Sequence, residues 1–274
     1  MKTTSFTFFA VSVWLCIAIG FSQADAQRAG GGMASGAGKV YDAVGKSTAV
    51  RGLQQKMNTS LLRSAVSRSG SGKTRPAQIR PSQVSPKMTT SGRPQTAPSQ
   101  SAAKPVFTDF VPTGDDNFAD KFAQTLGSND AEREFVKQLF VTTKDAFEKE
   151  VAAKGRDNNL AAAMTFFVAS TVTVYQDDPE PSDEATDKLW DGLDGSLNDL
   201  PEVAAMSDAE KQEMYDTLVG LSGLVLVGHI TAKQTGDAET GRIYKALAGE
   251  LIKTVLKTDP AKLRFGTKGL NVSN

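Results

Sequence analysis

The stretch LVGLSGLVLVGHI, from Leu218 to Ile230, is apolar on every face of a helix. Such a helix is stable only where other parts of the protein surround it. The stretch is too short to cross a bilayer, which needs about 20 apolar residues, and polar sequence follows it. We therefore predict that it forms a central, buried helix around which a helical domain is built.

Three glycines interrupt this stretch: Gly220, Gly223 and Gly228. Each glycine costs roughly 1 kcal/mol relative to alanine in a helix interior. We expect neighbouring helices to approach closely where these residues leave the surface without side chains. The alternative is an apolar cavity beside the glycines that carries a small ligand.

Residue patterns on both sides of the stretch predict an all-α fold, a single bundle of about six helices over residues 106–274. Ser207 and Glu210 have capping-box spacing and would open the central helix, which Gly236 would end. The helices expected before it are a short one over Asp116–Leu126, a long one capped by Asn129, an apolar one over Leu160–Tyr175 capped by Asp157 or Asn158, and an acidic one after Pro181.

Beyond the central helix, we expect one more helix between Asp237 and Asp259. The remaining tail has no hairpin signal. We expect it to strap across the bundle through Leu263, Phe265 and Leu270.

The two parts of the chain carry opposite charge, although the formal net charge is +0 at pH 7. Residues 27–105 contain 13 Lys and Arg and one acid, Asp42, whereas residues 106–274 contain 17 Lys and Arg against 29 Asp and Glu. This asymmetry indicates a basic arm attached to an acidic domain.

The arm is rich in Gly, Ser, Thr, Pro, Gln and Arg and has almost no aromatic residues. Such a composition buries too little apolar surface to offset chain entropy, so we predict that residues 27–105 are disordered. The alternative is a basic amphipathic helix that forms on a membrane surface or a partner. Its apolar positions would be Val40, Val44, Leu53, Met57, Leu61 and Val66, with Lys46, Arg51, Lys56 and Arg63 beside them.

Residues 1–26 have the pattern of a signal peptide. Lys2 precedes an apolar run over Phe6–Ile19, and Ala24-Asp25-Ala26 predicts cleavage before Gln27; a membrane anchor is the competing interpretation. The only cysteine, Cys16, lies in the apolar run, so a mature chain would have no disulfide, thiolate nucleophile or cysteine-bound metal. We expect a periplasmic or secreted protein with no transmembrane segment in the mature chain.

Nucleotide binding and histidine chemistry have little support in the sequence. Gly45-Lys46-Ser47 and Gly72-Lys73-Thr74 lack the earlier glycine of a P-loop. His229 is the only histidine, so one chain holds no multi-histidine metal site. We expect a neutral, buried His229 with a hydrogen-bond partner; the rival role is a general base. Ser222 is two turns away, about 10.5 Å of helix rise, too far to serve as its nucleophile.

Ten carboxylates and one cation, Lys188, lie between Asp177 and Glu202. No register of this segment matches the EF-hand pattern, so we expect no calcium site. A solvated helix face is one interpretation and a partner-binding acidic face is the other, and such a face could also pair with the basic arm. Its residues would be Asp183, Asp187, Asp191 and Asp194.

Two carboxylates in an apolar pocket could hydrolyse an envelope polysaccharide. Glu150 and Glu250 adjoin apolar positions and are the candidates for such a pair. Surface ion pairs are the competing interpretation for both residues.

Scattered residues of the domain resemble a known family. They are Phe110-Val111-Pro112, Asn159–Ala162, Tyr175, Pro181-Ser182-Asp183, Lys211-Gln212, Tyr215, Gly236-Asp237, Asp259-Pro260, Leu263 and Gly269-Leu270. This pattern resembles the exported bacterial proteins grouped as domain of unknown function 6683, over about residues 110–270 and without the basic arm. The resemblance implies an exported helical module and supplies no catalytic residues.

Together these patterns predict a non-enzymatic binding or scaffolding protein of the bacterial cell envelope. Its arm would contact an anionic envelope surface, and its domain would bind an envelope protein. We expect no cofactor, no metal, no catalytic residue and no nucleic-acid partner. A polymer hydrolase and a carrier of small apolar ligands are the alternatives.

Overall fold

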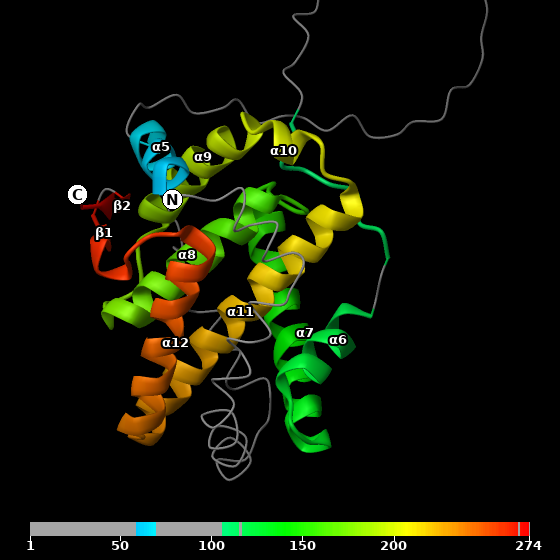
Figure 1. The fold of residues 1–274 in the computed structure, drawn as a ribbon, viewed down its shortest axis with the longest axis vertical. Coiled ribbons are helices and arrows are strands. Elements are labelled where there is room, and N and C mark those ends of the chain that lie inside the picture. Colours follow the sequence, from blue (N-terminus) through cyan, green and yellow to red (C-terminus); the bar gives the residue numbers. More distant parts are fainter. Residues whose placement is uncertain (1–58, 70–105, 115–116, 268, 274) are drawn as a thin grey trace, which may run out of the picture.

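A computed structural model describes residues 59–69, 106–114, 117–267 and 269–273 (Figure 1). The described helices are α5 Thr59–Ser69, α6 Phe118–Leu126, α7 Asp130–Ala153, α8 Leu160–Gln176, α9 Asp183–Asn198, α10 Pro201–Ala204, α11 Asp208–Thr235 and α12 Ala238–Leu256. A 3-10 turn at Pro260–Lys262 and strands β1 Leu263–Gly266 and β2 Gly269–Val272 follow. The all-α class is confirmed. The predicted signal peptide, Cys16 and both Gly-Lys-hydroxyl triplets lie outside the described residues.

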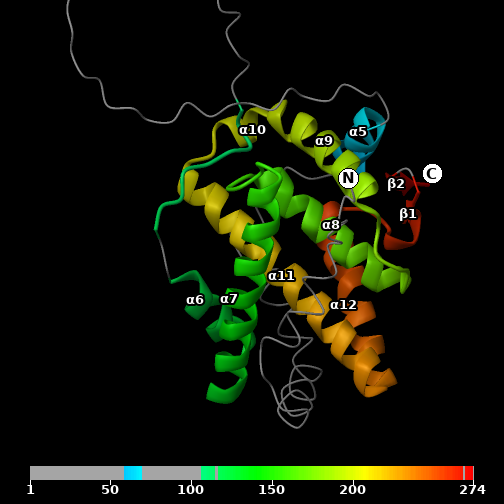
Figure 2. The ribbon, with the colours of Figure 1, turned by 180° about the vertical axis from the view of Figure 1, so that it is seen from behind.

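Helix α11 contains the apolar stretch, and other helices cover it. It contacts α7, α8 and α12, and both views show it between α7 and α12 (Figures 1 and 2). The backbone N–H of Ser207 donates to Glu210 at 2.8 Å, and the backbone N–H of Glu210 donates to Ser207 Oγ at 3.3 Å. Gly236 ends the helix with a φ of 70°. The predicted capping box and stop are therefore confirmed.

The three glycines of α11 face side chains of neighbouring helices. A Cβ atom at Gly220 would lie 2.9 Å from the Phe122 ring, and one at Gly223 would lie 2.5 Å from Thr143 Oγ1. At Gly228 the ring of Tyr244 occupies the space of a side chain. The expected close approach is confirmed, and these glycines do not line an apolar cavity.

Helix α11 is also the one described helix that is long and apolar enough to span a membrane. Of the 18-residue window that meets this test, 89% is buried inside the fold. Its apolar character is thus used in packing against the other helices.

Helix α8 is buried continuously from Leu160 to Val174, as predicted for a buried helix. The prediction of its N-cap was one or two residues early. Asn159 is the cap, with extended backbone (φ −119°, ψ 121°), and its side chain accepts from the Ala162 N–H at 2.9 Å. Asn158 has a φ of 50°, a left-handed conformation that an N-cap does not adopt.

The predicted strap at the C-terminus is wrong, because this segment forms an antiparallel hairpin. Leu263 pairs with Val272, and Gly266 pairs with Gly269 across a two-residue connection. Gly269 has a φ of 124°, which favours glycine. Strand β1 packs on α8, and β2 packs on α9 and α5. Leu263 and Leu270 are buried, so their predicted contact with the domain holds although the form of the segment differs.

The prediction of disorder is wrong for Thr59–Ser69, which forms helix α5. Leu62 and Ala65 are 0% exposed and Leu61 is 7% exposed. The folded part therefore begins before the boundary predicted at residue 106. The alternative prediction, an amphipathic helix within the arm, is correct for these residues. The helix packs on α9 and β2 of the domain.

Candidate interaction surface

Helix α9 carries the acidic residues predicted to bind a partner. Its N-cap Ser182 accepts from the Ala185 N–H at 3.3 Å, and Asp183 and Glu184 in the first turn complement the positive end of the helix dipole. The inner face of the helix is held by three buried leucines, Leu189, Leu193 and Leu197. The acidic face is thus built on a helix fixed to the domain.

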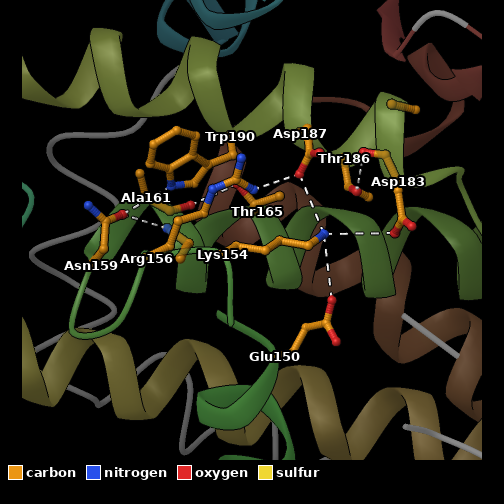
Figure 3. Close-up of polar contacts among 12 residues, drawn as sticks. Glu150, Lys154, Arg156, Asn159, Ala161, Thr165, Asp183, Thr186, Asp187 and Trp190 are labelled. Atoms are coloured by element: carbon orange, nitrogen blue, oxygen red, sulfur yellow. Dashed lines mark hydrogen bonds and ion pairs between the residues drawn. The ribbon is translucent and has the colours of Figure 1, made fainter. Parts of the chain in front are cut away.

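On one flank of α9, carboxylates meet two cations from the end of α7 and the turn after it (Figure 3). Lys154 Nζ lies 3.5 Å from Asp187 and 3.8 Å from Asp183. Arg156 donates to Asp187 at 2.7 Å. The ion pairs are partly buried, since the Lys154 and Arg156 side chains are 24% and 17% exposed. Their main consequence here is that the chain itself neutralises part of the acidic face.

Trp190 connects this flank to α8. The guanidinium carbon of Arg156 lies 4.0 Å from the centroid of the Trp190 ring, a cation–π contact. The indole Nε1 donates to Asn159 Oδ1 at 3.2 Å (Figure 3). Because Asn159 caps α8, the hydrogen bond from Trp190 fixes α9 against the start of that helix, and Arg156 packs over the same indole ring.

Asp194 is a correction to the predicted face, because it is buried with 3% exposure. Its Oδ1 accepts from Thr108 Oγ1 at 2.5 Å and from Asn198 Nδ2 at 3.1 Å. It therefore holds the segment before α6 (residues 106–114) on α9 and does not belong to the exposed acidic face. Asp191 is partly buried, and burial raises its pKa above the ordinary value while Arg156 opposes the shift.

On another side of α9 lies α5, beside β2 (Figure 1). Arg68 donates from Nη1 to the Gly195 carbonyl and from Nη2 to Asp199 Oδ2, both at 2.7 Å. A Cβ atom at Gly195 would lie 3.4 Å from Arg68 Nη1, so the glycine leaves room for the guanidinium. Arg68 of the arm therefore pairs with Asp199 of the acidic segment, which lies outside the four residues predicted for the acidic face.

His229 is buried, with 8% exposure, as predicted for a core histidine. Its Nε2 lies 3.3 Å from Asp177 Oδ1, and Lys233 Nζ lies 2.5 Å from the same oxygen. Burial lowers the pKa of His229, and Lys233 lowers it further, while Asp177 opposes the shift. The buried Nδ1 has no hydrogen-bond partner within the described parts of the chain.

Ser222 Oγ donates to the Leu218 carbonyl at 2.6 Å, so it is not a nucleophile held by His229.

Glu150 and Glu250 each pair with a lysine of their own helix region. Glu150 lies 3.5 Å from Lys154, and Glu250 lies 2.6 Å from Lys253. Both residues therefore match the interpretation as ion-pair partners.

A buried ion pair between α7 and α11 was missed by the sequence analysis. Lys144 Nζ lies 2.6 Å from Asp216 Oδ1 and 3.6 Å from Glu148 Oε1. Burial raises the pKa of Glu148, and it raises the pKa of the nearby Tyr215 hydroxyl strongly. The signal in the sequence was an aspartate beside the apolar stretch of α11 and a lysine one turn after Phe140, on the inner face of α7.

A pocket of about 500 Å³ lies between the α8–α9 connection and the hairpin. Its walls include Val172, Pro179 and Phe265, and Arg264 forms two hydrogen bonds with Asp178 at its edge, at 3.0 and 3.3 Å. No residue pattern in the sequence predicts this pocket, because one of its walls is the hairpin. Over the described residues, no group of three or more His, Cys, Asp or Glu side chains is placed to hold a metal ion.

These features define a predominantly helical protein in which an acidic helix is flanked by cations of the same chain. The chain belongs to DUF6683, a family of unknown function, whose family model matches residues 9–273. The family model begins at residue 9 and therefore covers the basic arm. The resemblance was expected to cover only about residues 110–270. Comparison with curated proteins and with solved structures finds no match.

Proposed function

We propose that the protein is an exported, non-enzymatic binding or scaffolding protein of the bacterial cell envelope. Residues 1–26 would direct export and be removed, leaving a periplasmic or secreted chain. A helical bundle around α11 would present a surface to an envelope protein. The basic arm, residues 27–105, would contact an anionic surface or a partner.

The observation that carries this proposal is the contact of α5 with α9. Helix α5 belongs to the basic arm, yet it binds an acidic helix through buried leucines and a terminal arginine. An amphipathic helix on a complementary surface is a common mode of protein recognition. The arm thus contains at least one segment with the chemistry of a binding element.

The charge of the arm supports an anionic target. The arm contains 13 Lys and Arg and only one acidic residue, Asp42. Each Lys or Arg close to an anionic lipid surface adds about 1 kcal/mol of attraction. Salt screens this attraction, because the Debye length falls from about 30 Å at 0.01 M to about 8 Å at 0.15 M ionic strength.

Vesicle sedimentation of the chain from Gln27 onward tests the proposal. We expect binding to vesicles with phosphatidylglycerol at low salt, weaker binding as salt rises, and little binding to pure phosphatidylcholine. The control variant changes the Lys and Arg of residues 27–58 and 70–105 to Gln and leaves α5 intact. Circular dichroism checks that its helices persist. Equal binding by the variant and the unchanged chain would reject the proposal.

A further inference from the structure

Helix α5 has one apolar face, and α9 covers it. We propose that α5 is a membrane-binding helix held on the acidic domain, so that docking on α9 and insertion into an anionic lipid surface exclude each other. This inference rests on the proposed contact of the arm with anionic surfaces and names the segment that the domain restrains.

The buried face of α5 is well defined. Leu61, Leu62 and Ala65 lie on one side of the helix and are at most 7% exposed, against α9 and β2. Arg63 and Ser64 lie on the exposed side. A helix at a membrane interface buries its apolar face and keeps its polar face toward the headgroups. The leucines of α5 cannot contact α9 and lipid at the same time.

Docking also uses one of the cations of α5. The helix contains Arg63 and Arg68 and no acidic residue. Arg68 is bound to Asp199 at 2.7 Å. A lipid phosphate accepts hydrogen bonds from a guanidinium in the same way as a carboxylate does. The acidic helix therefore competes with the membrane for the arginine as well as for the leucines.

The contact between α5 and α9 is weak enough to be reversible. Helix α5 has 11 residues, and helices shorter than about 12–15 residues are marginal alone in water. It needs a surface in order to fold, and either α9 or a bilayer supplies one. Its ion pair with Asp199 is 46% and 42% exposed at the two side chains, so it contributes about 0.2–1 kcal/mol. Residues 70–105 keep α5 joined to the domain, so docking is intramolecular.

The first test weakens docking without altering the arm. Asp199→Arg places a cation opposite Arg68, whereas Asp145→Arg makes the same charge change at an exposed site on α7 and is the matched control. We expect D199R to bind phosphatidylglycerol vesicles about two- to tenfold more tightly than D145R. Equal binding by the two variants would overturn the inference. Absence of binding by the unchanged chain would instead reject the proposed function.

The second test holds α5 in place. Because Arg68 Cδ lies 3.7 Å from the position of a Cβ at Gly195, cysteines in R68C/G195C are within reach of a short bismaleimide. The mature chain is expected to have no other thiol. We expect the cross-linked chain to bind anionic vesicles more weakly than the same chain before cross-linking. Equal binding before and after would overturn the inference while leaving the arm's contact with anionic surfaces intact.

Discussion

Lys144 and Asp216 form an ion pair in which a single substitution should be costly. The Asp216 side chain is 3% exposed, and Lys144 Nζ lies 2.6 Å away. Asp216→Asn leaves Lys144 with the more distant carboxylate of Glu148, at 3.6 Å, and the rings of Phe140 and Tyr215. We expect D216N to lower the free energy of unfolding by about 1–3 kcal/mol in urea denaturation. The variant K144M/E148Q/D216L removes the pair together with the carboxylate that Lys144 also faces, and it should recover most of this loss. An unchanged D216N would contradict the prediction.

His229 should make stability depend on pH, and it is the only histidine in the chain. Burial and Lys233 hold its pKa in the folded protein below the ordinary value. The unfolded chain therefore binds more protons than the folded one below about pH 6.5, and stability falls as the pH decreases. We expect the stability difference between the unchanged chain and His229→Gln to shrink from pH 7 to pH 5 in denaturant titrations. A constant difference would contradict this.

At the scale of single residues, helix caps could be predicted from the sequence, whereas the partners of buried polar side chains could not. Asn129, Ser207 and Gly236 were predicted as helix ends because caps depend on the residues next to them. Asp194 was assigned to a surface because its burial depends on Thr108, 86 residues away in the chain. No prediction was made for Asp216, because its partner, Lys144, lies on another helix.

Between elements, the glycines of α11 set how closely its neighbours approach. Gly228→Ala would place a methyl group against the Tyr244 ring of α12, and overpacking of this kind costs about 1–3 kcal/mol. The control is Gly241→Ala within α12, where the new Cβ would meet only Ala232 at 3.8 Å. We expect a lower thermal midpoint for G228A and an unchanged or higher midpoint for G241A. Equal midpoints would contradict the assignment of close packing at Gly228.

The helices with long apolar stripes were predicted, whereas the hairpin and helix α5 were not. The hairpin has four residues in each strand, too few for alternation to be recognised. Helix α5 lies in a segment whose average composition predicts disorder, and its stability comes from α9 and β2. Elements that depend on tertiary contacts for their existence carry a weak local signal.

At the scale of the whole molecule, α5 connects two parts of opposite charge. By docking on α9, it joins Thr59–Ser69 of the basic arm to the domain over residues 106–274. The family match spans both parts. The overall dimensions of the chain should therefore depend on one helical contact.

Leu62→Asp tests this dependence, because Leu62 is 0% exposed between α5 and the domain. An uncompensated carboxylate in an apolar contact costs several kcal/mol, more than a marginal 11-residue helix can offset. We expect α5 to leave α9, so that residues 27–69 attach to the domain only through residues 70–105. The radius of gyration from small-angle X-ray scattering should then increase, while the circular dichroism of the other helices changes little. The matched control is Ser64→Asp, which adds the same charge on the exposed side of α5. Equal radii for the two variants would mean that α5 does not hold the arm to the domain.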